Sequence, residues 1–316
     1  MKRVYVLDAF HPAGPHWLAD KVELIPYGDP RAEHWHEDAD GVMVRMHSLT
    51  AEDFARAGKL KAVLKQGVGV NTIDLDAARQ HGVVVANTPG INSEAVSEMA
   101  LALALAVSRR IPLFDRMVRA GEPIERPKFL GYALQEKTVA VIGMGNIGAR
   151  AARKFQAAFD CRILAYDPYY KPRASNDPWD QIPHTRMHDL DEVCAQADLL
   201  TVHVPLTEQT QDMISTRQLG LMKPNGIVVN VSRGGIVNEE ALYEALVSGH
   251  LFGAGLDVWT EREPPETTHP LLSLPTVVAT PHAAGGTVET QQRSSLKVAQ
   301  ELFRVLQGEE PESRVV

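Results

Sequence analysis

The chain has 316 residues, which is room for two domains at about 150 residues each. Its 44% hydrophobic and 23% charged residues are typical of a globular protein and exclude a disordered or collagen-like chain. With 32 basic and 40 acidic residues the formal net charge is −8, and no basic block is present. We therefore expect a small-molecule partner and no nucleic acid.

The chain also lacks features of a secreted or membrane protein. Its first residues contain no apolar run long enough for a signal peptide, and the most apolar stretch, 95–107, is too short to span a bilayer. Cys161 and Cys194 lie in apolar stretches and predict buried thiols rather than a disulfide framework. We expect a cytoplasmic protein without a membrane partner.

Short apolar runs alternate with longer helical patterns along the chain. Because these runs are nearly continuous rather than alternating, they predict strands buried on both faces of a parallel sheet that helices flank. The runs of the first part are 4–7, 22–25, 42–44, 62–64 and 83–86, and those of the second part are 138–142, 163–166, 199–204, 227–231, 254–258 and 277–279. The pattern predicts a doubly wound α/β fold.

A long helical segment separates the two sets of strands. Asn92 or Ser93 can cap its start, and the pattern continues, with a break near Pro112, to Gly121. The last helical pattern, 288–307, follows the final strand, and we expect it to pack on the first domain.

A glycine-rich turn follows the first apolar run of the second part. Gly143 allows the tight turn, Gly145 lets the backbone approach a pyrophosphate, and Gly148 lets the following helix pack closely on the strand. The amides of Asn146 and Ile147 then face an anion at the helix N-terminus. The turn predicts a dinucleotide site.

Asp167 ends the next apolar run, 19 residues after Gly148. An acidic side chain near that spacing accepts hydrogen bonds from the adenosine ribose and repels a 2′-phosphate, so it predicts NAD rather than NADP. The alternative is a turn residue before Pro168.

Polar side chains stand at the ends of the later runs, where ligands bind in an open parallel sheet. Arg233 can hold a carboxylate and polarise a keto oxygen, and His282 can exchange a proton near neutral pH. A carboxylate beside the histidine would favour its protonated form. Each residue alone could be an ordinary surface residue, but together they suit a hydroxy-acid/keto-acid couple.

The sequence resembles the D-isomer-specific 2-hydroxyacid dehydrogenase family over nearly its whole length. Besides the glycine-rich turn, the motifs that carry the resemblance are 67–74, 87–90, 95–98, 203–207, 230–237, 256–258 and 280–282. It implies a flavodoxin-like substrate domain at 1–103 plus 286–316, with a Rossmann NAD-binding domain at 104–285 inserted in it. It also implies reversible interconversion of a 2-keto acid and a D-2-hydroxy acid, and a homodimer formed through about 92–135.

The resemblance assigns roles to three catalytic residues. Arg233 binds the substrate carboxylate and keto group, His282 is the general acid/base, and Glu263 is the partner of His282. The family's glutamate commonly stands five residues after the aspartate of its Asp-Val pair, where this chain has Arg262. Glu263 is preferred because it precedes proline, and Glu261 is the alternative.

The resemblance also assigns binding residues. Asp257 holds the nicotinamide carboxamide, and the cofactor is lined by further residues, namely Val204, Val231, Ser232, Arg233 and His282. The substrate carboxylate binds the backbone amides of Val68, Gly69 and Val70. Arg45 and His47, in the loop after the run 42–44, are candidates to contact the substrate tail or are ordinary surface residues.

Other interpretations remain open at this point. The segment His34-Trp-His36-Glu-Asp38 mimics a metal cluster but lacks further ligands, so we expect no metal. An NAD(H)-sensing corepressor-like binding module and a formate or phosphonate dehydrogenase are alternatives to the main interpretation. Glyoxylate, hydroxypyruvate, pyruvate, longer keto acids and phosphorylated hydroxy acids are all open as substrates.

Overall fold

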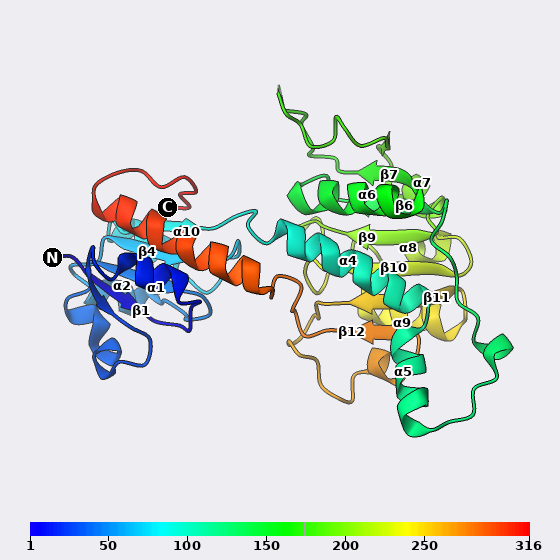
Figure 1. Cartoon of the computed structure of the whole chain (residues 1–316). Helices are drawn as coiled ribbons and strands as arrows, with labels where there is room; N and C mark the ends of the chain where they lie inside the picture. Colours follow the sequence, from blue (N-terminus) through cyan, green and yellow to red (C-terminus); the bar gives the residue numbers. More distant parts are fainter. Residues whose placement is uncertain (174) are drawn as a thin grey trace. The chain divides into compact units, whose positions relative to one another are not determined.

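The structure, a computed structural model, describes residues 1–173 and 175–316 (Figure 1). The chain forms two compact units, which are described separately below. Unit 1 comprises Met1–Asn92 and Gly286–Val316, and unit 2 comprises Ser93–Gly285.

Unit 1 is built on a five-stranded parallel sheet of order β2-β1-β3-β4-β5. This is the flavodoxin-like order, which fits the expectation for this domain. The strands are β1 (Arg3–Val6), β2 (Glu23–Ile25), β3 (Gly41–Val44), β4 (Ala62–Lys65) and β5 (Val84–Asn87), and the helices are α1 (Ala13–Leu18), η1 (Pro30–Glu37), α2 (Ala51–Arg56), α3 (Leu75–Gln80) and α10 (Val288–Leu306).

Both faces of this sheet are buried, as the continuous apolar runs predict. Val42 and Val63 pack with Phe54 of α2 on one face, and their strand neighbours pack against α1 and α10 on the other. Helix α10 lies along α1 (Figure 1). The two approach so closely that a Cβ on Gly14 would lie 2.3 Å from the Ser295 carbonyl oxygen. The last helix therefore completes the first unit.

Unit 2 is built on a seven-stranded parallel sheet of order β12-β11-β10-β9-β6-β7-β8. Counted from β6, this is the Rossmann order 3-2-1-4-5-6 with one more strand at the edge. The strands are β6 (Thr138–Ile142), β7 (Arg162–Tyr166), β8 (Thr185–Met187), β9 (Leu199–Val202), β10 (Gly226–Asn230), β11 (Leu251–Leu256) and β12 (Val277–Ala279). The helices are α4 (Ser93–Ser108), α5 (Ile111–Ala120), η2 (Arg126–Phe129), α6 (Asn146–Phe159), α7 (Leu190–Ala195), α8 (Thr216–Leu221), α9 (Glu239–Val247) and η3 (Pro270–Ser273).

Helix α4 belongs to unit 2 from its first turn, and this moves one expected domain boundary. A Cβ on Gly255 would lie 2.7 Å from Leu103 Cβ, and one on Gly253 would lie 2.6 Å from Val107 Cγ1. Because the two glycines of β11 let the helix lie against the sheet, the change of unit falls at 92/93 rather than at the expected 103/104. The other change of unit falls at 285/286.

The elements differ from the expected ones in a few places. Strand β8 has no apolar pattern in its sequence, Thr-Arg-Met, and it lies at a sheet edge where burial does not demand one. Strands β9 and β11 end before His203 and Asp257, so both side chains stand just beyond a strand rather than inside it.

Two further features concern the whole chain. Cys161 and Cys194 are buried free thiols, and burial raises their pKa values to about 11 and about 12. Within residues 1–173 and 175–316, no helix combines the length and apolar character needed to cross a membrane.

Candidate active site

The glycine-rich turn joins β6 to α6 in unit 2. Gly143 has a positive φ of 102°, and a Cβ on it would lie 2.9 Å from the His203 carbonyl oxygen. A Cβ on Gly148 would lie 2.0 Å from the Gly143 oxygen, whereas one on Gly145 would meet nothing within 4 Å. The first and third glycines thus serve the protein's own packing. Gly145 leaves open space at the N-terminus of α6, where phosphate groups can approach.

Asp167 directly follows β7 and supports this turn. Its Oδ2 accepts a hydrogen bond from Met144 N at 3.0 Å, and its Oδ1 accepts one from Tyr169 N at 2.9 Å. On the other side, buried Trp179 donates from Nε1 to the Met144 carbonyl oxygen at 2.8 Å. The turn is therefore fixed at Met144. Each Asp167 oxygen still has a free lone pair for a further donor, such as a ribose hydroxyl.

His203 lies against the same turn and is uncharged. Burial lowers the pKa of its imidazole to about 3. Its Nε2 lies 3.0 Å from Thr201 Oγ1, and its Nδ1 is buried without a partner among the described residues. Since an imidazole that is neutral at physiological pH is not poised to exchange protons, His203 is unsuited to the role predicted for His282.

Asn230, at the end of β10, shapes the turn that carries Arg233. Its Oδ1 accepts from Ser232 N at 3.0 Å and from Ser232 Oγ at 2.8 Å, and its Nδ2 donates to the Arg233 carbonyl oxygen at 2.9 Å. Val231 and Ser232 are buried, whereas Arg233 is exposed. Within the described residues the Arg233 side chain makes no ion pair, so its guanidinium is available to an anionic ligand.

His282 and Glu263 form a direct pair. His282 Nδ1 hydrogen-bonds Glu263 Oε2, and the two side chains are 40% and 29% exposed. The structure thus brings Glu263, and not Glu261, to His282, and the imidazole Nε2 is left for another partner. His282 also has a positive φ of 59°, which is strained for a residue with a side chain and is common at functional sites.

Asp257 holds the turn on which His282 stands. Its side chain is fully buried, and its Oδ1 accepts from Thr280 Oγ1 at 2.5 Å and from Ala283 N at 2.8 Å. Its Oδ2 accepts from Ala284 N at 2.8 Å, and its carbonyl oxygen accepts from His282 N at 2.6 Å. The resemblance suggests only cofactor binding for this residue, but the structure gives it three internal bonds to the turn.

In unit 1, the turn after β4 presents unused backbone donors. Gly67 has a positive φ of 103°, and the turn is held by Asn87 Nδ2, which donates to the Val68 carbonyl oxygen at 2.7 Å. In the part of the chain that the structure describes, the amides of Val68, Gly69 and Val70 donate to no protein acceptor. Consecutive free amides in a turn make an anion-binding concavity.

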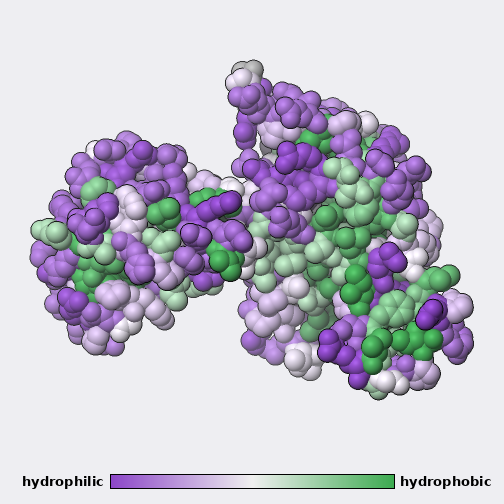
Figure 2. Space-filling view, viewed as in Figure 1, coloured by the Kyte–Doolittle hydropathy of each residue, from purple (hydrophilic) through white to green (hydrophobic). Residues whose placement is uncertain are grey.

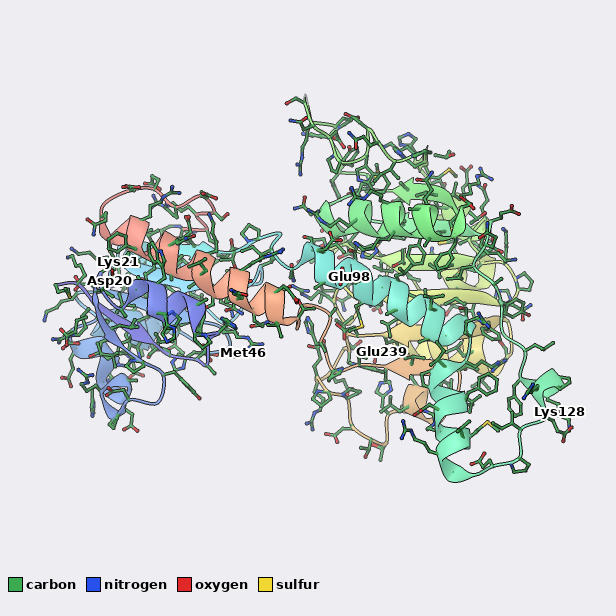
Figure 3. The ribbon with its side chains drawn as sticks, in the orientation of Figure 1. Asp20, Lys21, Met46, Glu98, Lys128 and Glu239 are labelled. Atoms are coloured by element: carbon green, nitrogen blue, oxygen red, sulfur yellow. The ribbon has the colours of Figure 1, made fainter. Side chains whose placement is uncertain are left out.

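The loop after β3 is held by Asp8. Its Oδ2 accepts from the amides of Arg45, Met46 and His47 at 2.6, 3.1 and 3.0 Å. Buried Lys65 donates to the Arg45 carbonyl oxygen, and burial lowers the pKa of this lysine. The side chains of Arg45, Met46 and His47 are exposed; Met46 is labelled in Figure 3.

The histidine-rich segment near residue 36 does not gather into a metal centre. His36 Nε2 pairs with Asp53 Oδ1 at 2.8 Å, and His34 lies 3.8 Å from Glu37 on the surface. Across residues 1–173 and 175–316, no three His, Cys, Asp or Glu side chains are arranged to hold a metal ion.

Several residues that build these turns were given no role from the sequence. They are Asp8, Lys65, Asn230, Thr280, Glu239 and His269, and all act through hydrogen bonds to turns rather than through an exposed functional group. The only available signal was their position, since Asp8, Lys65, Asn230 and Thr280 are polar residues at the end of apolar runs.

Comparison with known proteins identifies the family. Residues 101–284 match the D-isomer specific 2-hydroxyacid dehydrogenase, NAD binding domain. The chain is 40% identical to D-3-phosphoglycerate dehydrogenase of Methanocaldococcus jannaschii over 319 residues, which is 100% of this chain and 59% of that protein. It is 37% identical to hydroxypyruvate reductase of Thermotoga maritima over 315 residues, covering 96% and 98% of the two chains.

A solved structure gives the same result for the fold. The structure of a Thermus thermophilus protein matches with a TM-score of 0.88 at 35% identity, covering 99% of this chain and 100% of that one. A Rossmann sheet with this glycine-rich turn and an acidic residue after the second strand defines an NAD-binding protein. The chain belongs to the D-isomer-specific 2-hydroxyacid dehydrogenase family, and NAD is its cofactor. It spans only 50 to 59% of the length of several D-3-phosphoglycerate dehydrogenases that it matches.

Proposed function

We propose that the protein is an NAD-dependent oxidoreductase that interconverts a 2-keto acid and a D-2-hydroxy acid. The observation that carries this proposal is the His282–Glu263 pair, which stands on a turn fixed by Asp257 in the NAD-binding unit. A histidine paired with a carboxylate is suited to give and take the hydroxyl proton of such a couple.

The glycine-rich turn fits the cofactor. The open space above Gly145 and the N-terminus of α6 suit the pyrophosphate, with the amides of Asn146 and Ile147 as donors. The free lone pairs of Asp167 suit the adenosine ribose, and its charge disfavours a 2′-phosphate. Val204, Val231 and Ser232 are proposed to line the rest of the site. NADH, when bound, supplies a hydride to the carbonyl carbon of the substrate.

The proton and the substrate carboxylate are assigned to other groups. His282 donates a proton from Nε2 to the keto oxygen, and Glu263 at Nδ1 orients the ring. Arg233 binds the carboxylate and polarises the keto group. Asp257 has a lone pair left on Oδ2, which we assign to the carboxamide of the cofactor.

Unit 1 is proposed to supply substrate recognition. The free amides of Val68, Gly69 and Val70 bind the substrate carboxylate, and Arg45 and His47 contact its tail. The relatives are named for D-3-phosphoglycerate, hydroxypyruvate and glyoxylate, so 3-phosphohydroxypyruvate, hydroxypyruvate and glyoxylate are the first substrates to test.

A homodimer is proposed to form through helix α5 and the segment after it. Large hydrophobic side chains are exposed there: Ile111 is 53% exposed, Val118 68%, Leu130 71% and Tyr132 40%. Figure 2 shows hydrophobic residues gathered over α4 and α5 of unit 2. Contiguous exposed apolar surface of this kind marks an interface between proteins.

The proposal is tested by following NADH and NADPH absorbance with a panel of 2-keto acids, and NAD with 2-hydroxy acids. We expect turnover with NADH well above NADPH, and a loss of about 10²-fold or more in kcat for His282→Ala. Glu263→Ala should lose activity as well, whereas Glu261→Ala should stay near the wild type and serves as the matched control.

The result can also contradict the proposal. If NADH binds but no 2-keto or 2-hydroxy acid is turned over, an NAD(H)-sensing module becomes the better interpretation. If Glu261→Ala is as damaging as Glu263→Ala, the pairing with His282 that we propose for catalysis is wrong.

A further inference from the structure

A second histidine–glutamate pair lies close in sequence to the first and has no role in the proposed chemistry. Glu239, in the first turn of α9 and labelled in Figure 3, accepts at Oε2 from His269 Nε2 at 3.1 Å. Their side chains are only 17% and 19% exposed. His269 Nδ1 accepts from Leu271 N at 3.3 Å, which leaves the ring proton on Nε2 and directs it to Glu239.

The second pair is connected to the first through two successive amides. Glu239 Oε1 accepts from Thr260 N at 2.9 Å, and Glu263 Oε1 accepts from Trp259 N at 3.1 Å. Since Glu263 Oε2 is bound to His282, both oxygens of each glutamate are occupied by one histidine and one amide of this segment.

The ring of Trp259 strengthens the connection. It meets the His269 ring edge to face, with 5.3 Å between centroids and 73° between planes. Its Nε1 donates to the Thr280 carbonyl oxygen at 3.0 Å, two residues before His282. Trp259 is 4% exposed, so it transmits any displacement of His269 to the turn that carries His282.

The same peptide supports the turn of Arg233. A Cβ on Gly234 would lie 2.0 Å from the Trp259 carbonyl oxygen and 2.6 Å from Thr260 N. The peptide between Trp259 and Thr260, which Glu239 holds, thus packs on Gly234 next to Arg233, and the amide of the preceding peptide, Trp259 N, donates to Glu263.

We propose that Glu239 and His269 form a positioning pair for the active site. They fix the peptide between Trp259 and Thr260 and the ring of Trp259, and Trp259 in turn sets the position of Glu263 through its amide and of the Arg233 turn through its carbonyl group. The inference rests on the proposed function of those two residues. It assigns no proton transfer to Glu239 or His269.

The test compares Glu239→Ala with Glu239→Gln and with Glu266→Ala. We expect Glu239→Ala to lower kcat about 10- to 100-fold and to move the acid limb of the pH profile of kcat/KM, because Glu263 loses its fixed position. The Kd for NADH, measured by fluorescence, should change less than about twofold. Glu239→Gln should recover only part of kcat, because its amide oxygen still accepts from Thr260 N while its NH2 group faces the Nε2 proton of His269.

Glu266→Ala is the matched control because it removes a nearby carboxylate whose one ion pair among the described residues is with exposed Arg262. Its kinetics should equal those of the wild type. Equal kinetics and pH profiles for wild type and Glu239→Ala would overturn the proposal. If Glu239→Ala does not fold, His269→Gln takes its place, since it weakens the pair and keeps a donor to Glu239.

A readout without turnover separates this inference from the proposed function. Hydrogen exchange of the Trp259 and Thr260 amides, followed by NMR on the full chain, should speed up about tenfold or more in Glu239→Ala and not in Glu266→Ala. Faster exchange in a protein that turns over no acid supports the positioning pair while the proposed function fails. Unchanged exchange of these two amides in Glu239→Ala contradicts the positioning pair even when the wild type is active.

Discussion

The turn after β4 in unit 1 and the turn after β11 in unit 2 are built in opposite ways. In the first, the amides of Val68, Gly69 and Val70 have no acceptor among the residues that the structure describes, and the side chain of Val68 is exposed. The second is held by internal hydrogen bonds, because the fully buried Asp257 side chain accepts from three donors of the same turn. Main-chain donors left free suit the binding of an anion, whereas proton transfer demands side chains that cannot move.

The supports of the two turns differ accordingly. In unit 1 the neighbouring loop is held by one carboxylate, that of Asp8, on three amides, and Arg45 and His47 project without ion pairs among the described residues. In unit 2 the support is a chain of bonds through Asp257, Glu239 and Trp259. A change in unit 1 should therefore affect substrate affinity, and a change in unit 2 should affect the rate of the chemical step.

The largest effect is expected for Asp257→Ala. It leaves the donors on Thr280, Ala283 and Ala284 without their acceptor, at a cost of about 1–3 kcal/mol for each donor that water cannot reach. The melting temperature should fall by several degrees and kcat by about 10²-fold or more. Thermal unfolding and NADH-linked assays measure the two effects.

The control is Asp20→Ala, the same change at a carboxylate that is 79% exposed and labelled in Figure 3. Its melting temperature and kcat should match the wild type. A stable and fully active Asp257→Ala protein would show that the turn of His282 does not depend on this carboxylate.

A second comparison lies within the glycine-rich turn. Gly148→Ala should destabilise the fold by about 1–3 kcal/mol because its Cβ would meet the Gly143 oxygen at 2.0 Å. Gly145→Ala should leave the melting temperature unchanged and weaken NADH binding about tenfold or more, because its Cβ points into space left for the phosphates. Denaturant unfolding and NADH titration separate the two; equal losses of stability would contradict the assignment.

In unit 1 we expect Asp8→Ala to raise KM for the keto acid about tenfold while kcat changes less than about threefold. The reason is that Arg45, Met46 and His47 lose the acceptor that sets their loop, and nothing in the catalytic pair is touched. Asp20→Ala is again the matched control. A loss confined to kcat would break the division of roles between the two units.

The smallest effect is expected for Lys65→Met, and it depends on pH. Burial lowers the pKa of Lys65 in the folded protein below the ordinary value of 10.5, so the unfolded chain binds its proton more tightly. Stability of the wild type should therefore rise with pH between the lowered pKa and 10.5, relative to Lys65→Met, which has no such group. Melting temperatures of both proteins from pH 7 to 10 test the sign. The melting temperature of the wild type minus that of Lys65→Met should rise with pH, and a value that stays constant or falls contradicts the prediction.

Much of the fold could be predicted because its causes are local. Continuous apolar runs found all the strands except β8, whose Thr-Arg-Met sequence has neither pattern nor burial to reveal it. The glycine-rich turn could be predicted because each of its glycines keeps a different space free of a Cβ atom. The exact boundary depends on contacts that are distant in sequence, because Leu103 and Val107 lie against Gly255 and Gly253.

The candidate site could be predicted only in part, because some of its contacts join residues that are distant in sequence. Arg233 and His282 stand at strand ends, and sequence position alone points to them. The proline after Glu263 favours it over Glu261 in the sequence, but the contact of Glu263 with His282 depends on the geometry of a loop. The bonds of Asp257, Glu239 and Asp8 join segments far apart in the chain, and no short pattern records them.

The placement of α10 in unit 1 bears on how the protein is made. Unit 2 is one continuous stretch, so a ribosome delivers all of its strands in a single pass. Unit 1 receives its first 92 residues early and its covering helix only after all of unit 2 has been synthesised. At a synthesis rate of about 5–20 residues per second, the apolar face of the unit 1 sheet stays uncovered for on the order of ten seconds or more. The nascent chain is thus exposed to chaperones and to aggregation at its N-terminal unit, and slow translation through unit 2 lengthens that exposure.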